Sequence, residues 1–111
     1  MSEPDLTLNL FEQQVMLTVL RLAPDGYGVS IRDSLEERTS RKVSFGAVYT
    51  TLDRLEDKGF VARREGEATA ERGGRKKAYF TLTARGQMTL RAALQAMEAV
   101  KGGLVVDGVL A

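Results

Sequence analysis

One segment, Ser44 to Thr83, constrains the fold of this chain more than any other. It opens with residues suited to a short amphipathic helix, and Gly59 then supplies a common helix stop. Two strand-like runs follow, and the stretch between them is polar and rich in glycine. The segment therefore predicts a helix followed by a projecting hairpin, with most of the positive charge of the segment at the hairpin tip.

The helix in this segment has one apolar face and one face of small and charged residues. Ser44 suits its N-cap position, where a side-chain oxygen accepts a hydrogen bond from a backbone N–H of the first turn. Val48, Leu52 and Leu55 follow at i, i+4 and i+7 and should face a core. Tyr49 falls on one flank. At about 100° per residue, the opposite face holds Gly46, Ala47, Thr50, Asp53, Arg54 and Asp57.

Three other helices are predicted around this segment. The first begins after Asn9, the cap residue of a capping box, and its apolar side chains recur at helical spacing until Pro24. The second covers Val29 to Arg38. The last covers Ala84 to Lys101, and Thr83 is its N-cap.

The hairpin consists of two predicted strands, Phe60 to Glu65 and Lys77 to Thr83, with Gly66 to Lys76 as an exposed loop. Val43 is predicted to form one bridge of a small third strand. The fold class that follows is mainly α with a small β-hairpin. The pattern predicts a winged helix-turn-helix, in which the hairpin is the wing, followed by one further C-terminal helix.

The composition excludes several kinds of function. The chain has no cysteine and no histidine, so it has no disulfide, no thiolate metal site and no Ser-His-Asp arrangement. We therefore expect neither an enzyme, nor a cofactor, nor a bound metal. No run approaches the roughly 20 apolar residues that span a bilayer, and the acidic amino terminus does not suit a secretory signal. We expect a cytoplasmic protein with no membrane contact.

The net charge is only +1, so any attraction to nucleic acid must come from local clusters. Residues 63–77 form one such cluster, with six bases against three acids, a local net of +3. Arg75, Lys76 and Lys77 follow two glycines at the tip, where cations can neutralise phosphates or enter a minor groove. The alternative is a solvated hairpin whose charges serve solubility.

The exposed face of the central helix suits a major groove. Gly46, Ala47 and Thr50 are small, so the backbone can come close to base edges or to a thymine methyl group. Arg54 can reach a phosphate or a guanine, whereas two aspartates further along repel phosphates unless the helix enters by its amino-terminal end. Tyr49 is either a phosphate donor or a half-buried core residue. The helix positions predicted to contact DNA are Ser44, Gly46, Ala47, Tyr49, Thr50 and Arg54.

The last helix carries an apolar stripe, Leu90, Leu94 and Met97, with no obvious partner inside a domain of this size. An amphipathic helix that leaves a domain usually buries such a stripe against a second copy. We therefore expect a homodimer held by these three residues. Residues 1–83 would form the DNA-binding domain, and residues 84–111 the C-terminal dimerisation helix and tail.

Three segments resemble the PadR-like family of bacterial transcription regulators. Leu20 to Val29 is like the helix end followed by Gly-Tyr in that family. Gly46 to Gly59 is similar to its Gly-x-x-Tyr-x-x-Leu-x-x-Leu-Glu-x-x-Gly pattern. Gly73 to Thr83 resembles its wing, where a basic turn leads into an aromatic strand. The resemblance covers nearly the whole chain, from Leu8 to Val100.

This resemblance implies a homodimeric winged-helix protein, usually a repressor, that binds double-stranded DNA at an operator with two-fold symmetry. It suggests Tyr49 and the wing bases as DNA contacts. The short C-terminus resembles the smaller subgroup, some members of which bind aromatic compounds between the subunits, so a small-molecule effector of unknown identity is a further candidate partner. Two alternatives stay open: a winged-helix module that binds an acidic protein, and a small-ligand sensor whose DNA binding is secondary.

Overall fold

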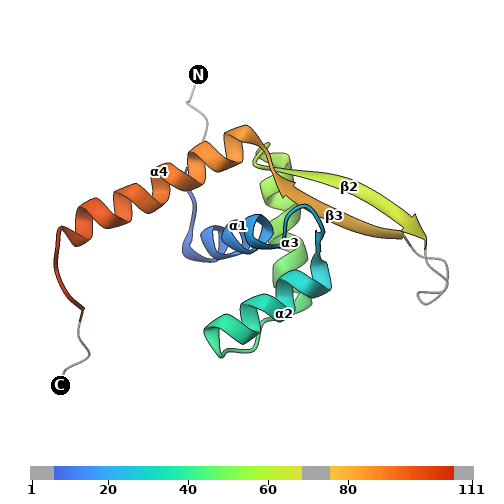
Figure 1. The fold of residues 1–111 in the computed structure, drawn as a ribbon, viewed down its shortest axis with the longest axis horizontal. Helices are drawn as coiled ribbons and strands as arrows, with labels where there is room; N and C mark the ends of the chain where they lie inside the picture. The colour runs from blue at the N-terminus through green and yellow to red at the C-terminus, as the bar shows by residue number, and fades with distance from the viewer. Residues whose placement is uncertain (1–6, 69–75, 107–111) are drawn as a thin grey trace.

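The structure, a computed structural model, describes residues 7–68 and 76–106 of the chain. Within these ranges it contains four α-helices and a three-stranded antiparallel sheet (Figure 1). The predicted fold class is confirmed, and each predicted helix is observed with its ends within about two residues of the expected ones. The order along the chain is α1 (Leu10–Leu22), β1 (Gly26–Tyr27), α2 (Gly28–Thr39), α3 (Phe45–Asp57), β2 (Val61–Ala68), β3 (Lys76–Leu82) and α4 (Ala84–Lys101).

Three of the helices begin at the side-chain caps that the sequence predicts. Asn9 Oδ1 accepts a hydrogen bond from the Glu12 N–H at 2.7 Å, and Glu12 Oε1 accepts one from the Asn9 N–H at 2.8 Å, which completes a capping box at α1. Ser44 and Thr83 cap α3 and α4, each accepting a bond from the N–H three residues further on, at 3.0 and 2.9 Å. These bonds satisfy backbone donors that have no partner within the first turn of a helix.

The β2–β3 hairpin is the predicted wing. β3 is the central strand of the sheet and pairs with β2 on one side and with β1 on the other. Both wing strands are longer than expected toward the tip, since β2 continues to Ala68 and β3 already starts at Lys76. The pairing becomes irregular between Glu65 and Ala68.

The third strand is not at Val43, and that prediction is wrong. The strand is Gly26–Tyr27, which lies opposite Phe80 and Tyr79 of β3. The Val43 N–H instead donates to Glu36 Oε2 at 2.8 Å. A strand of two residues is too short for the alternating pattern by which strands are recognised in a sequence.

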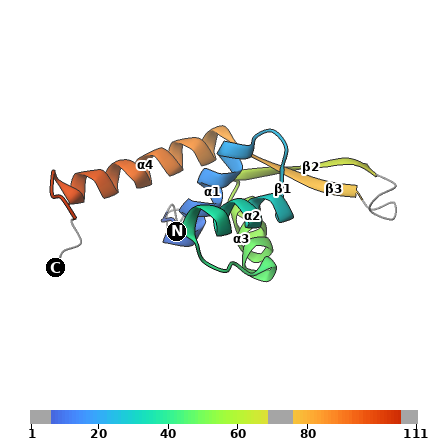
Figure 2. The same ribbon diagram turned by 60° about the horizontal axis from the view of Figure 1, so that its bottom comes forward.

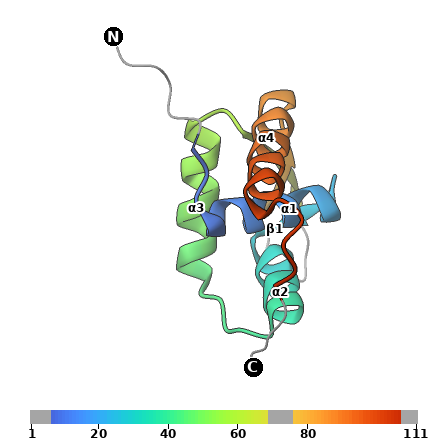
Figure 3. The ribbon, with the colours of Figure 1, turned by 90° about the vertical axis from the view of Figure 1, so that its left-hand side faces the viewer.

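The core is built from residues of the three amino-terminal helices, of the sheet and of the start of α4. Helix α4 lies across α1 (Figure 3). The predicted apolar stripe of α3 is confirmed, because Val48, Leu52 and Leu55 are fully buried. This burial determines how α3 is rotated and hence which of its residues face outward. The buried apolar residues of the core are Leu8, Val15, Met16, Val19, Ile31, Leu35, Val48, Leu52, Leu55, Phe60, Val61, Phe80, Leu82 and Leu90.

The start of α4 is packed directly on the root of the wing. A Cβ at Gly86 would overlap the carbonyl oxygen of Phe60, the residue before β2, so the lack of a side chain permits this close approach. The Thr83 N–H donates to the same Phe60 oxygen at 3.0 Å, and Thr83 Oγ1 donates to the Gly59 oxygen at 2.7 Å. From this junction α4 and the wing extend in opposite directions (Figure 2).

Candidate nucleic-acid interface

The amino-terminal half of α3 presents small residues to solvent. Gly46, Ala47 and Thr50 are exposed, because the buried stripe turns them away from the core. The nearest neighbour to the Cβ position of Gly46 is Ser44 Oγ at 4.0 Å, so the helix backbone is accessible there. Ser44 is exposed too, and its oxygen serves as the helix cap. Another molecule can therefore come close to the backbone of this half of α3.

Tyr49 borders this surface and packs on α2. A Cβ at Gly28, the first residue of α2, would overlap Tyr49 Oη, so the phenol rests on the backbone at that position. The Tyr49 side chain nevertheless stays 43% exposed. Tyr49 is thus half-buried, as one of the two descriptions has it, with one side packed on α2 and the rest exposed to solvent. The prediction that its hydroxyl donates to a phosphate stays a prediction.

Two residues that the sequence analysis did not single out, Phe45 and Arg32, lie on the same side. Phe45 is the first residue of α3, and its ring stacks near that of Tyr49, with centroids 6.3 Å apart and planes at 24°. The Arg32 guanidinium carbon lies 4.0 Å from the Phe45 centroid. The spacing from Phe45 to Tyr49, one helical turn, is the signal that could have placed Phe45 on this flank.

Arg54, a predicted DNA contact, is turned toward α1. Its Nη1 atom lies 3.6 Å from Glu12 Oε2, and Lys58 Nζ lies 3.2 Å from the same oxygen. Glu12 is only 2% exposed, and a buried carboxylate is costly without such partners. Arg54 and Lys58 therefore join α3 to the first turn of α1, and this role is internal to the chain.

The acidic charge of α3 is partly neutralised by the wing. Arg63 Nη2 of β2 lies 2.9 Å from Asp53 Oδ1 and 3.3 Å from Glu56 Oε1. Exposed pairs of this kind contribute little to stability. Their effect here is electrostatic, since they reduce the repulsion that Asp53 would exert on a phosphate.

Cations of the two wing strands also lie over aromatic rings. Lys77 Nζ is 4.2 Å from the centroid of Tyr27, and the Arg64 guanidinium carbon is 4.8 Å from the centroid of Tyr79. The two tyrosine rings meet edge to face, with centroids 5.9 Å apart. Such contacts hold each cation in place while leaving its charge available to the surface.

The bases counted in the wing segment are thus not equivalent. Arg63 and Arg64 pair with acids of the same chain, Arg64 with Asp25 at 3.3 Å. Lys77 is on β3 beside Tyr27. The predictions for Arg75 and for the side chain of Lys76 lie outside the described residues.

The predicted dimerisation stripe of α4 divides into two parts. Leu90 is 3% exposed and belongs to the core of its own chain, so the expectation that the stripe has no partner within the chain is wrong for this residue. The reason is that the amino-terminal part of α4 packs on the core through Leu90 and the partly buried Ala93. Beyond these residues the helix extends away from the body (Figure 1). Leu94 and Met97, further along, are 39% and 58% exposed.

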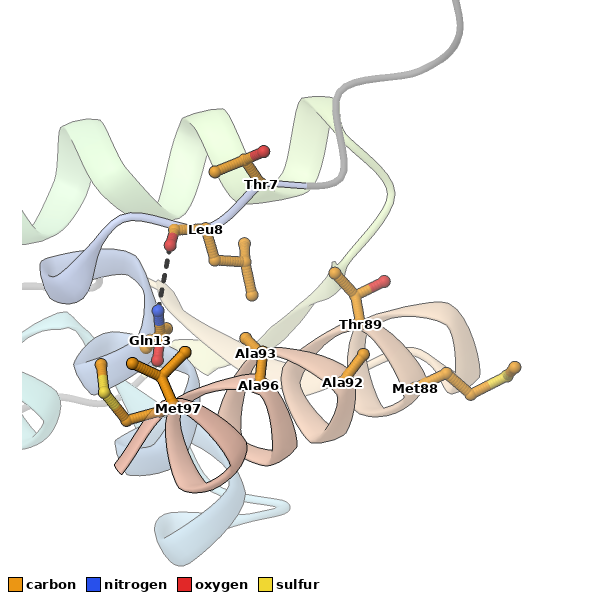
Figure 4. Close-up of a pocket in the computed structure, with 10 residues that line it drawn as sticks. Thr7, Leu8, Gln13, Met88, Thr89, Ala92, Ala93, Ala96 and Met97 are labelled. Carbon is orange, nitrogen blue, oxygen red and sulfur yellow. Dashed lines mark hydrogen bonds between the residues drawn. The ribbon is translucent and has the colours of Figure 1, made fainter. Parts of the chain in front are cut away.

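Two open apolar grooves follow α4. The larger, of about 680 Å³, lies between α4 and the segment of Thr7, Leu8 and Gln13, where Gln13 Nε2 donates to the Leu8 oxygen at 3.0 Å (Figure 4). On the α4 side it is lined by Met88, Thr89, Ala92, Ala93, Ala96, Met97 and Val100. The smaller groove, of about 470 Å³, includes Leu17 and Leu20 of α1. Continuous exposed apolar surface of this kind is typical of contact sites in other proteins.

Two other kinds of site are not found in the part of the chain that the structure describes. In residues 7–68 and 76–106, no three His, Cys, Asp or Glu side chains are grouped so as to hold a metal ion. No helix in these ranges combines the length and the apolar character that a membrane span requires.

Comparison with known proteins connects this geometry to one family. Residues 16–92 match the model of the transcriptional regulator PadR-like family. A PadR-like transcription factor from Bacteroides fragilis has a similar fold, with 23% identity and a TM-score of 0.72, and the match covers 83% of this chain and 84% of that one. A PadR-like transcriptional regulator from Bacillus cereus is also similar, with 20% identity and a TM-score of 0.68, and the match covers 83% of this chain and 84% of that one. The structure of the complex hsRosR-S4 shares 30% identity, with a TM-score of 0.63 and coverage of 90% and 76%. No curated protein matches the chain significantly.

Proposed function

Because this chain belongs to the PadR-like family of transcriptional regulators, which is not a family of enzymes, we propose that it is a repressor that binds a two-fold symmetric DNA operator as a homodimer. Helix α3 enters a major groove by its amino-terminal end, and the wing follows the adjacent phosphate backbone. Residues 1–83 make up the DNA-binding domain, and residues 84–111 the dimerisation helix and tail.

The accessible backbone at the start of α3 is the observation that carries this proposal. Gly46, Ala47 and Thr50 are exposed together, and no larger side chain covers the Cβ position of Gly46. Small side chains at this position let the helix backbone come close to base edges in a major groove. Arg63 supports the same orientation, because it neutralises Asp53 on the adjoining part of the helix.

The exposed part of α4 supports the homodimer. Leu94, Met97 and Val100 are exposed on the helix that extends from the body, and they border the two apolar grooves. A second copy that covers these grooves would give the assembly two-fold symmetry. Such a dimer reads two half-sites when its α3 helices lie about 34 Å apart, one turn of duplex. A small apolar effector held in the grooves would act by changing that separation.

The direct test is fluorescence anisotropy with duplex DNA from upstream of the protein's own gene and with a shuffled duplex of equal length, at about 150 mM salt. We expect a clear preference for the native duplex, with saturation at two chains per site. Equal affinity for both duplexes would leave only a basic surface. No binding to either would favour a winged-helix module that binds an acidic protein.

Removing the charge at the wing tip should weaken binding to all duplexes alike. In the triple variant Arg75→Ala, Lys76→Ala, Lys77→Ala, we expect the slope of log affinity against log salt to fall by about 0.9 for each lost phosphate contact, hence by up to about 2.7 per chain. The measurement is an anisotropy titration at four salt concentrations. Alanines at Arg21, Arg85 and Lys101 remove the same charge from exposed positions on α1 and α4 that line neither groove, and they serve as the control. An unchanged slope in the wing variant would show that the tip does not contact phosphates.

A further inference from the structure

The exposed ring of Phe45 has no role in the function proposed so far. The large exposed apolar side chains of the described residues lie on α1, on α4, in the segment after α4, and on α3. Most of those on α1 and α4 border the two grooves. On α3 they are Phe45 and Tyr49, which lie beside the accessible backbone at Gly46.

The position of the Phe45 ring is constrained by its neighbours. The Arg32 guanidinium covers the ring at 4.0 Å, and Arg32 is itself held by Asp33, whose Oδ1 accepts from Nη2 at 2.8 Å and from Nε at 3.2 Å. Tyr49 stacks near the ring and rests in turn on Gly28. Despite these contacts, Phe45 is 37% exposed. The ring is thus held in one orientation with part of its edge toward solvent, next to the helix end that would enter the groove.

The chemistry of the major groove offers few partners for such a ring. The base edges present hydrogen-bond donors and acceptors, and the one methyl group among them is that of thymine C5. A phenyl ring has no hydrogen-bonding atom, so it gains by removing that methyl group from water. The other base edges carry no methyl group and present mainly polar atoms to the ring.

We propose that Phe45 is a specificity-determining residue that contacts the C5 methyl group of a thymine in each half-site of the operator. Arg32 is a positioning residue, because its guanidinium lies over the Phe45 ring and is itself held by hydrogen bonds to Asp33. This inference rests on the proposed function and specifies which chemical group α3 recognises.

The test removes one methyl group at a time. The wild-type protein first selects its preferred duplex from a randomised pool, and each thymine of that duplex is then replaced by deoxyuridine. We expect one position in each half-site at which uracil weakens binding about fourfold, which is the effect of burying one methyl group. When both half-sites carry uracil at this position, binding should weaken about 16-fold. Phe45→Ala should bind the thymine and uracil duplexes equally, and Phe45→Leu should keep part of the difference.

A matched control is available on α1. Leu10 is likewise an exposed apolar residue in the first position of a capped helix, so Leu10→Ala should leave the thymine-to-uracil ratio unchanged. The inference is overturned if no thymine position is sensitive, or if Phe45→Ala retains the wild-type ratio. If the wild-type protein still selects a defined duplex, the proposed function stands even when the inference about Phe45 fails. If the protein selects no sequence at all, the proposed function and the inference about Phe45 are both overturned.

Discussion

Replacing Gly86 with alanine is expected to lower the free energy of unfolding by about 2 to 3 kcal/mol, the cost of forcing extra volume into a packed site. The added Cβ would overlap the Phe60 carbonyl oxygen, which belongs to the backbone and already accepts the Thr83 N–H. The start of α4 and the root of the wing would have to move apart. Thermal unfolding followed by circular dichroism, at equal protein concentrations, measures the change.

Gly46 is the matched control for this substitution. It is also a glycine within a helix, but the nearest atom to its Cβ position is Ser44 Oγ at 4.0 Å. Gly46→Ala should therefore raise the free energy of unfolding, because alanine is the better helix former. The gain should be below the roughly 1 kcal/mol of a helix interior, since Gly46 lies in the first turn. The two variants carry the same chemical change and should shift the unfolding midpoint in opposite directions. Shifts of the same sign would contradict the close packing of α4 on the wing.

The double variant Leu94→Glu, Met97→Glu is expected to dissociate the proposed homodimer and to weaken binding to the proposed operator by about 10²- to 10⁴-fold, the contribution of the second linked site. Both side chains are exposed on the single chain, so the monomer should stay folded. In the dimer, two carboxylates per chain would be buried against apolar surface, which is strongly unfavourable. Analytical ultracentrifugation measures the first effect and anisotropy the second.

A conservative pair of substitutions tests whether charge or shape matters at this surface. Leu94→Met with Met97→Leu retains the apolar volume, and such exchanges are usually well tolerated. This variant should remain dimeric and bind DNA as the wild type does. Persistence of the dimer in the glutamate variant would place the subunit contact on another surface of the chain.

The fold could be predicted almost entirely from local signals. Helix positions follow from apolar spacing and from caps such as Ser44 and Thr83, and these signals act within one turn of the chain. The third strand was placed wrongly because a two-residue strand has no pattern of its own. Gly26–Tyr27 is a strand only because β3 lies beside it, and this is a long-range contact.

The position of the candidate site could be predicted from the sequence, but the contacts that its side chains make with the rest of the chain could not. Helical periodicity correctly identified the exposed face of α3 with Gly46 and Thr50. It could not show that Arg54 pairs with Glu12, 42 positions earlier in the chain, or that Leu90 is enclosed by its own core. The sequence does not single out Phe45, because its contact with Arg32 joins two different helices. Contacts between side chains of different helices and strands decide which exposed residues remain available to a partner. The pattern of residues within one helix or strand does not reveal such contacts.

Because the start of α4 packs directly on Phe60 at the root of the wing, α4 and the wing should move together as one body. No linker separates them, since β3 ends at Leu82 and α4 begins at Ala84. β2 has eight residues, so at about 3.3 Å per residue the wing is about 26 Å long. If the junction is rigid, tilting α4 by about 5° moves the wing tip by about 2 Å, far enough to break a hydrogen bond to a phosphate. A rearrangement between subunits that leaves every core contact intact would thus be transmitted to the DNA backbone.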